Sequence, residues 1–140
     1  MIGERDMSMR TAGAILVLLS VATARAQDAL TAGDAALGEK VFVKCKACHQ
    51  IGEGAHTAVG PQLNGLIGRH SASIPNYSYS EAMKGSNIIW DEATFKEYIK
   101  DPKAKVPGTK MAFAGLSKQS DIDNLTAYLK AFGPDGKRIP

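Results

Sequence analysis

Five residues, CKACH from Cys45 to His49, constrain this chain more than any other stretch. Thiols three residues apart lie on the same side of a helical turn, so both can bond to one flat group. The spacing C-x-x-C-H is typical of c-type haem attachment. Each thiol forms a thioether to a porphyrin vinyl group, and the histidine binds the iron. The motif therefore predicts one covalently attached haem c, with Cys45 and Cys48 as attachment points and His49 as a metal ligand.

Other uses of two cysteines fit the chain less well. A thioredoxin-like redox pair needs a βαβ setting, and no strand pattern surrounds this motif. A structural zinc site needs four ligands, whereas Cys45 and Cys48 are the only cysteines, and His56 and His70 give no second pair. A plain disulfide stays open as an alternative, but it leaves His49 without a role.

The N-terminal segment reads as a secretory signal peptide. Ala12–Ala22 is an apolar run that is too short to cross a bilayer, which takes about 20 apolar residues. Ala24–Ala26 fits an A-x-A cleavage site, so we expect residues 1–26 to be removed; an uncleaved anchor is the alternative. Residues 27–140 then form a single domain. Export to the periplasm agrees with the haem motif, because c-type haem is attached outside the cytoplasm.

Apolar spacing predicts an all-α domain without strands. We expect helices over 34–48, 80–85 and 91–101, and a last helix from Ser117 or Ser120 to Phe132. Pro102 should stop or bend the third helix. Gly38, in the middle of the first helix, either admits another helix at close range or has no packing role. The formal net charge of +3 is too small to favour nucleic acid as a partner.

The ligand on the far side of the haem determines what such a protein does. After the proposed cleavage only Met83 and Met111 remain as thioethers. Met111 follows Pro107 and Gly108 in a loop, which can bring a side chain over a haem face, and is favoured over Met83, a typical core residue in a short helix. His56 and His70 are weaker candidates. The irregular stretch 50–80 is long enough to wrap a large cofactor.

Four segments in order resemble the class I c-type cytochromes, in particular the soluble bacterial cytochromes of the c-two type and mitochondrial cytochrome c. The segments are CKACH, VGPQLNGLIGR, a Trp before a helix that contains Tyr98, and PGTKMAFAG. The resemblance covers the chain from about Gly38 to Leu129. It implies a small cytochrome c fold, with helices around one haem and the first and last helices crossing.

The resemblance also implies roles for individual residues. Met111 would be the sixth ligand, Tyr98 would lie against its sulfur, and the Pro61 carbonyl would accept a hydrogen bond from His49. Gly38 and Phe42 would pack on Leu125 and Tyr128. The haem propionates would accept hydrogen bonds from Arg69, Tyr79 and Trp90. They would have Ser80 and Thr109 nearby. Met83 stands where mitochondrial cytochrome c has Asn, which predicts a drier haem pocket.

The function implied is electron transfer by a closed, six-coordinate haem without enzymatic activity. We expect a monomer that meets redox proteins such as a cytochrome bc complex, a terminal oxidase or a photosynthetic reaction centre, with only transient membrane contact. Docking would use lysines around the haem edge, namely Lys44, Lys46, Lys103, Lys105, Lys110 and Lys118. The alternatives are a haem enzyme or gas sensor with a labile sixth position, and a haem-free exported binding domain with a disulfide.

Overall fold

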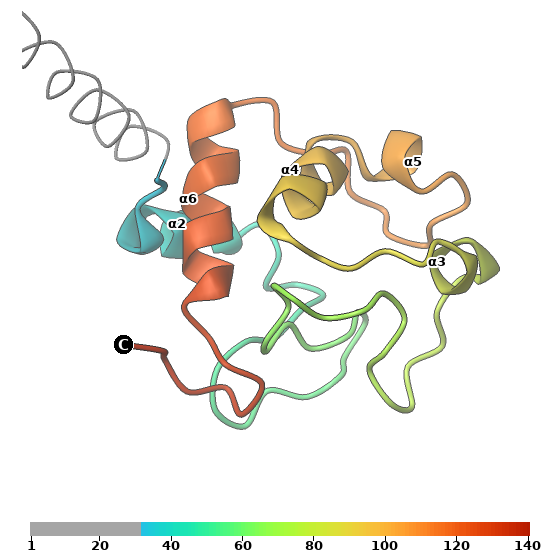
Figure 1. The fold of residues 1–140 in the computed structure, drawn as a ribbon, viewed down its shortest axis with the longest axis horizontal. Coiled ribbons are helices and arrows are strands. Elements are labelled where there is room, and N and C mark those ends of the chain that lie inside the picture. The colour runs from blue at the N-terminus through green and yellow to red at the C-terminus, as the bar shows by residue number, and fades with distance from the viewer. Residues whose placement is uncertain (1–31) are drawn as a thin grey trace, which may run out of the picture. The chain divides into compact units, whose positions relative to one another are not determined.

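The computed structural model describes residues 32–140, which form one compact unit. The proposed signal peptide, residues 1–26, lies outside the described residues. The described helices are α2 (Ala35–Phe42), α3 (Glu81–Gly85), α4 (Glu92–Lys100), α5 (Pro102–Lys105) and α6 (Gln119–Lys130). This part of the chain has two isolated β-bridges and no strand, so the predicted all-α class is confirmed (Figure 1). None of its helices has the length and apolar character needed to span a membrane.

Helices α2 and α6 cross in direct contact, as expected (Figure 1). A Cβ atom at Gly38 would overlap the backbone carbonyl of Asn124 and crowd Tyr128, so only glycine permits this approach. The rings of Phe42 and Tyr128 pack beside the crossing with their centroids 5.3 Å apart. The mid-helix glycine therefore exists to bring the two helix backbones together, and its cost in helix propensity is offset by that packing.

Helix α2 is shorter than predicted. It begins after Asp34, whose carboxylate accepts hydrogen bonds from the first backbone amides, and it ends at Phe42 rather than continuing to Cys48. From there the backbone tightens into turns: the amide of Cys45 donates to the carbonyl of Phe42, and that of Cys48 to the carbonyl of Cys45. The C-x-x-C-H segment is therefore a series of tight turns and not the end of a long helix.

Pro102 opens a helix that the sequence did not predict. It ends the α4 pattern as expected, but it also occupies the first position of α5, where a proline lacks only an amide that would have no partner. The Asp101 side chain caps this short helix by accepting from the amide of Ala104. Helix α6 follows Lys118, with no side-chain cap, so it begins at Gln119, between the two predicted starts, Ser117 and Ser120.

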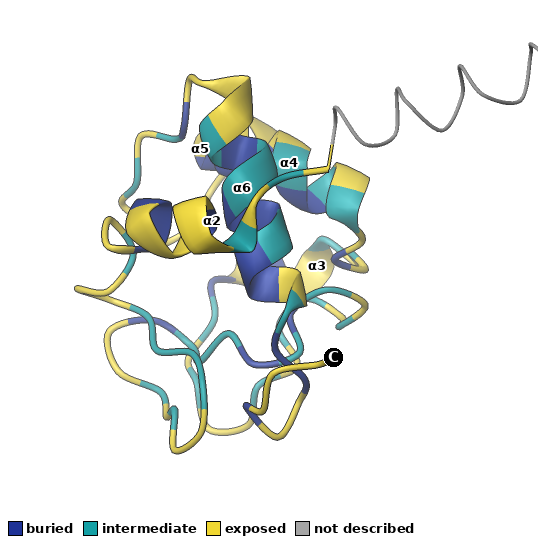
Figure 2. Cartoon of the chain, turned by 90° about the vertical axis from the view of Figure 1, so that its left-hand side faces the viewer, coloured by how far each residue is buried: buried dark blue, intermediate teal, exposed yellow. Residues whose placement is uncertain are grey.

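The core lies between α6, α2 and α4, where the inward face of α6 is almost completely buried (Figure 2). Ile122, Leu125 and Leu129 are at most 2% exposed. The stretch from 50 to 80 contains no helix, and backbone hydrogen bonds order it instead. The amide of Trp90 donates to the carbonyl of Arg69, and that of Ser71 to the carbonyl of Ile88. The helices thus form one side of the molecule, and hydrogen-bonded loops form the other.

Candidate cofactor-binding site

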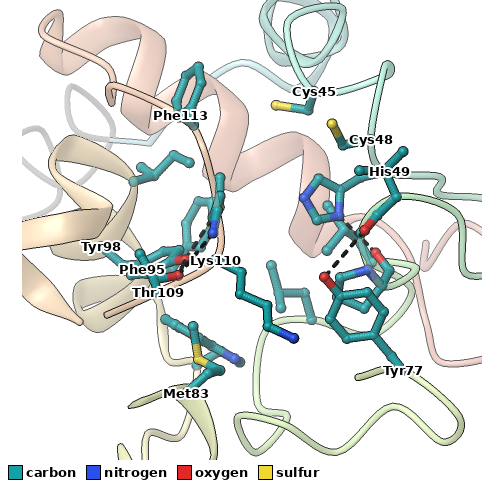
Figure 3. Close-up of a pocket in the computed structure, with 18 of the residues that line it drawn as sticks. Cys45, Cys48, His49, Tyr77, Met83, Phe95, Tyr98, Thr109, Lys110 and Phe113 are labelled. Atoms are coloured by element: carbon teal, nitrogen blue, oxygen red, sulfur yellow. Dashed lines mark hydrogen bonds between the residues drawn. The ribbon is translucent and has the colours of Figure 1, made fainter. Parts of the chain in front are cut away.

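A cavity of about 450 Å³ lies between the helices and the loops. One wall carries Cys45, Cys48 and His49 from the turns after α2, and the facing wall carries Tyr98 from α4 and Thr109 from the following loop (Figure 3). Every residue predicted to hold the cofactor lines it. They are Cys45, Cys48, His49, Pro61, Arg69, Tyr79, Ser80, Trp90, Tyr98, Thr109 and Met111.

The His49 ring is fixed on two sides. Its Nδ1 atom lies 2.8 Å from the carbonyl oxygen of Pro61. A carbonyl can only accept, so Nδ1 carries the proton and Nε2 keeps a free lone pair. Gly60 lies against the same ring, and a Cβ atom there would overlap it. The imidazole therefore presents Nε2 in one orientation, which is the arrangement that protein-bound metals require of a histidine ligand.

Burial favours the uncharged forms of His49 and Cys45. It lowers the pKa of His49 from its ordinary value, against the opposing effect of the Pro61 hydrogen bond. It also raises the pKa of Cys45 to about 11, against a smaller opposing effect of Lys44. The imidazole is thus neutral at physiological pH and able to bind a metal. Both cysteines are free thiols, so the disulfide alternative has no support in this geometry.

On the facing wall, Met111 is held by a small hydrogen-bonded group. The Tyr98 hydroxyl donates to the Met111 sulfur at 3.3 Å and lies 3.3 Å from the Thr109 hydroxyl. The Thr109 hydroxyl in turn accepts from the Met111 amide. Gly108, at a φ of 90°, makes the turn that brings these residues to the cavity. Burial raises the pKa of Tyr98, which therefore stays a hydrogen-bond donor well above neutral pH.

The residues predicted to contact the propionates have partners within the protein. Arg69 is half-buried and donates to the carbonyls of Asn64 and Gln62. The Tyr79 hydroxyl accepts from the amide of Ile74. The Ser80 hydroxyl caps α3 by accepting from the amide of Met83, a local role common for a serine just before a helix. Trp90 is buried against Tyr98, with ring centroids 4.9 Å apart.

Sequence reasoning anticipated only part of the lining. Met83, 8% exposed, lines the cavity, in agreement with the prediction that this residue makes the haem pocket drier. Phe113 lies two residues beyond Met111 and lines it as well (Figure 3). Asn64, outside the lining, also drew no attention, although it is 7% exposed and its side-chain amide pairs with the amide and the carbonyl of Gly52. The apolar stripes of α4 and α6 could have predicted more of the cavity lining, because Phe95, Ile99, Leu125 and Leu129 belong to them.

Of the two histidines that were weaker ligand candidates, His56 lies outside the cavity lining and His70 lies in its exposed part. The His56 ring is exposed and pairs with Gln50, 3.2 Å away, outside the cavity lining. His70 is exposed, and its backbone pairs with Ile89. Of the six candidate docking lysines, Lys44 and Lys110 border the cavity and the other four do not.

The cavity fits a haem. It is large, its lining is mostly apolar, and it brings the His49 imidazole and the Met111 sulfur together from different segments, a ligand pair that haem iron accepts. The part of the chain that the structure describes has no cluster of three His, Cys, Asp or Glu residues that would hold another metal. Two free thiols at the attachment spacing complete the match.

Comparisons with known proteins agree with this geometry. Residues 35–132 match the family model for cytochrome c. The chain is 58% identical to cytochrome c-554 of Methylosinus trichosporium over 93% of its length and 99% of that protein. It is 52% identical to cytochrome c2 of Blastochloris viridis over 90% of its length and 94% of that protein.

A solved structure extends the comparison to the fold. Cytochrome cH from Methylobacterium extorquens is 46% identical and superposes with a TM-score of 0.67, over 71% of this chain and 99% of that one. The predicted resemblance and the predicted haem c are therefore confirmed. The chain belongs to the cytochrome c family, whose members are electron-transfer proteins with covalently attached haem c.

Proposed function

We propose that this protein is a periplasmic carrier of single electrons, in which His49 and Met111 would both hold the haem iron. The observation that carries the proposal is the pairing of two preorganised ligands across one cavity: an imidazole fixed by Pro61 and a thioether fixed by Tyr98. When bound, the haem supplies a one-electron change between Fe(II) and Fe(III). Since His49 and Met111 would both bind the iron, no site on the iron would be left open for a substrate.

The chain's own residues favour rapid electron exchange by moving little. Hydrogen bonds from Nδ1 of His49 to Pro61 and from Tyr98 to Met111 hold both ligands in place without help from solvent. Apolar side chains from α4 and α6 line the cavity, and with the haem bound they would limit the access of water to it. We assign Arg69, Tyr79 and Trp90 to the propionates, with Ser80 and Thr109 nearby. A guanidinium has five N–H donors, so Arg69 can bind a carboxylate while it holds two backbone carbonyls.

The proposed partners are redox complexes with acidic docking sites, such as a cytochrome bc complex, a terminal oxidase or a photosynthetic reaction centre. The six candidate lysines are not equally available to them. Lys44 pairs with Asp121 at 3.7 Å, Lys105 pairs with Glu97, and the Lys110 ammonium donates to the carbonyl of Ser78 at 2.9 Å. Lys46, Lys103 and Lys118 are exposed. We expect these three to contribute most to the salt dependence of docking.

Carbon monoxide tests the closed iron site. The reduced natural protein should not bind it, whereas Met111→Ala should bind it readily because the sixth position opens. Met83→Leu is the matched control, since it removes the other thioether of the same cavity and should leave the site closed. Carbon monoxide binding by the folded natural protein would favour the enzyme or sensor alternative.

Partner docking is tested by the rate of haem reduction or oxidation with candidate membranes at several ionic strengths. The rate should fall with added salt, and Lys103→Gln should lower it at low salt. Lys137→Gln, in the C-terminal tail, is the control. A rate independent of ionic strength would contradict docking through lysines. The mass of the exported protein checks the proposed cleavage after Ala26.

A further inference from the structure

Two stretches around the His49 ring are joined by a regular series of hydrogen bonds. The amide of Gly60 donates to the carbonyl of Cys48 at 2.8 Å, and the amide of Leu63 donates to the carbonyl of Gln50 at 2.9 Å. Between these two bonds lies the contact of His49 Nδ1 with the Pro61 carbonyl. The segment 60–64 therefore lies along the segment 48–52, and the position of the Pro61 carbonyl depends on this alignment.

The far end of this alignment is closed by one side chain. Asn64 accepts from the amide of Gly52 through Oδ1 at 2.8 Å and donates to the carbonyl of Gly52 through Nδ2 at 3.0 Å. We call this pair of bonds the Asn64 clip. The Asn64 backbone carbonyl also accepts from Arg69. The residue is only 7% exposed, and a buried amide is costly unless it is paired on both sides, as it is here.

The C-terminal turn covers the clip from outside. Gly136 is buried at a φ of 79°, and a Cβ atom there would overlap the Gly52 carbonyl and crowd the Asn64 amide. The amide of Gly65 donates to the carbonyl of Phe132 at 3.2 Å. Figure 1 shows the end of the chain, in dark red, running beneath α6 beside this loop. The turn therefore shields the two hydrogen bonds of the clip from water.

We propose that Asn64 is a positioning residue for the redox site: through its clip to Gly52, it keeps the Pro61 carbonyl on the ring N–H of His49, and the C-terminal turn protects the clip. The inference rests on the proposed role of His49 as an iron ligand. The bond to Pro61 raises the basicity of the imidazole, and a more basic ligand favours Fe(III). Loosening the bond therefore raises the reduction potential.

Exchange of the His49 ring proton with solvent tests the clip directly, by NMR of the reduced holoprotein labelled with nitrogen-15. Asn64→Ala should accelerate exchange at least tenfold and raise the reduction potential. Gly136→Ala should act in the same direction, and it carries the test if Asn64→Ala does not fold. Asp34→Ala is the control for general destabilisation, because it removes the cap of α2 far from this loop. It should leave both quantities unchanged.

Three outcomes would overturn the proposal. The first is an exchange rate of the His49 ring proton in Asn64→Ala that is within twofold of the rate in the natural protein. The second is an acceleration of this exchange in Asp34→Ala that equals the acceleration in Asn64→Ala. The third is faster exchange in Asn64→Ala with an unchanged reduction potential. A different result would contradict the iron ligation instead. If the His49 ring of the natural protein titrates near its ordinary pKa of about 6.5, it is not bound to iron, whatever the state of the clip.

Discussion

The crossing of α2 and α6 and the loops that line the cavity are held together by different means. At the crossing, Gly38 brings two helix backbones into contact, and Leu125 and Leu129 are almost completely buried. In the loops, single hydrogen bonds to backbone groups fix the chain, as at Pro61 and Asn64. The crossing depends on shape, and the loops depend on donors, acceptors and the cofactor between them. Substitutions in the two regions should therefore differ in size and in what they change.

The largest effect should come from leaving the cofactor out. Without it, the apolar side chains that line the cavity of about 450 Å³ are left exposed to water, and a domain of this size has little other buried surface to compensate. We expect the chain produced without haem attachment to lose cooperative thermal unfolding, measured by circular dichroism. Protected backbone amides throughout 50–80 in the haem-free chain would contradict this dependence of the loops on the cofactor.

The next largest effect should be steric, at the crossing. Gly38→Val places side-chain atoms where the Asn124 carbonyl lies, so we expect a loss of about 3 kcal/mol or more in the free energy of unfolding, measured with denaturant on the holoprotein. Gly85→Ala is the matched control, since a Cβ atom there meets nothing within 4 Å. If both glycine variants have similar stability, the crossing is less tightly packed than described.

A smaller effect should follow from adding a polar group to the cavity. Met83→Asn buries an amide among apolar side chains, which costs about 1–3 kcal/mol if the amide finds no partner. It should also lower the reduction potential, because a more polar surrounding stabilises the more highly charged Fe(III) site. Met83→Leu, which nearly conserves volume, is the control and should cost less than about 1.5 kcal/mol. Unchanged stability and potential in Met83→Asn would count against a dry pocket.

The smallest effect should come from removing one hydroxyl. Tyr98→Phe removes the hydrogen bond to the Met111 sulfur, at a net cost of about 1 kcal/mol. The sulfur then donates more electron density, so the reduction potential should fall.

The same variant has a pH signature. Burial raises the pKa of Tyr98 in the folded protein, so its contribution is complete below the unfolded value of about 10 and is lost as pH rises through the folded value. The free energy of unfolding should decline less steeply above pH 10 in Tyr98→Phe than in the natural protein. Equal slopes would mean that Tyr98 does not titrate in this range.

The crossing was the more predictable of the two regions. Ile122, Leu125 and Leu129 repeat at helical spacing, and this periodicity is a local property of the sequence. The end of α2 was predicted wrongly, because the turns from Phe42 to Cys48 are set by the need to present two thiols and an imidazole to one cavity. Helix α5 was missed because Pro102 was considered only as a terminator, although a proline also suits the first position of a helix.

The loops could be predicted only through motifs. CKACH and PGTKM identify residues that line the cavity, since their chemistry is unusual for a loop. Asn64 carries no such signal, because its partner Gly52 lies twelve residues away and its cover, Gly136, lies at the other end of the chain. The proposed roles of Arg69 and Tyr79 at the propionates likewise depend on a cofactor whose position no local pattern records. These assignments remain predictions.

The distribution of the cavity lining along the chain has a consequence for assembly. Its first wall is complete by Pro61, but Met111, Leu125 and Leu129 are synthesised much later. Cys45 is partly enclosed in the folded chain, where burial raises the pKa of its thiol and makes it harder to ionise. Haem attachment is therefore favoured before α6 docks on α2. The docking of the last helix then closes the protein over a cofactor that is already joined to it, so maturation and folding form one ordered sequence.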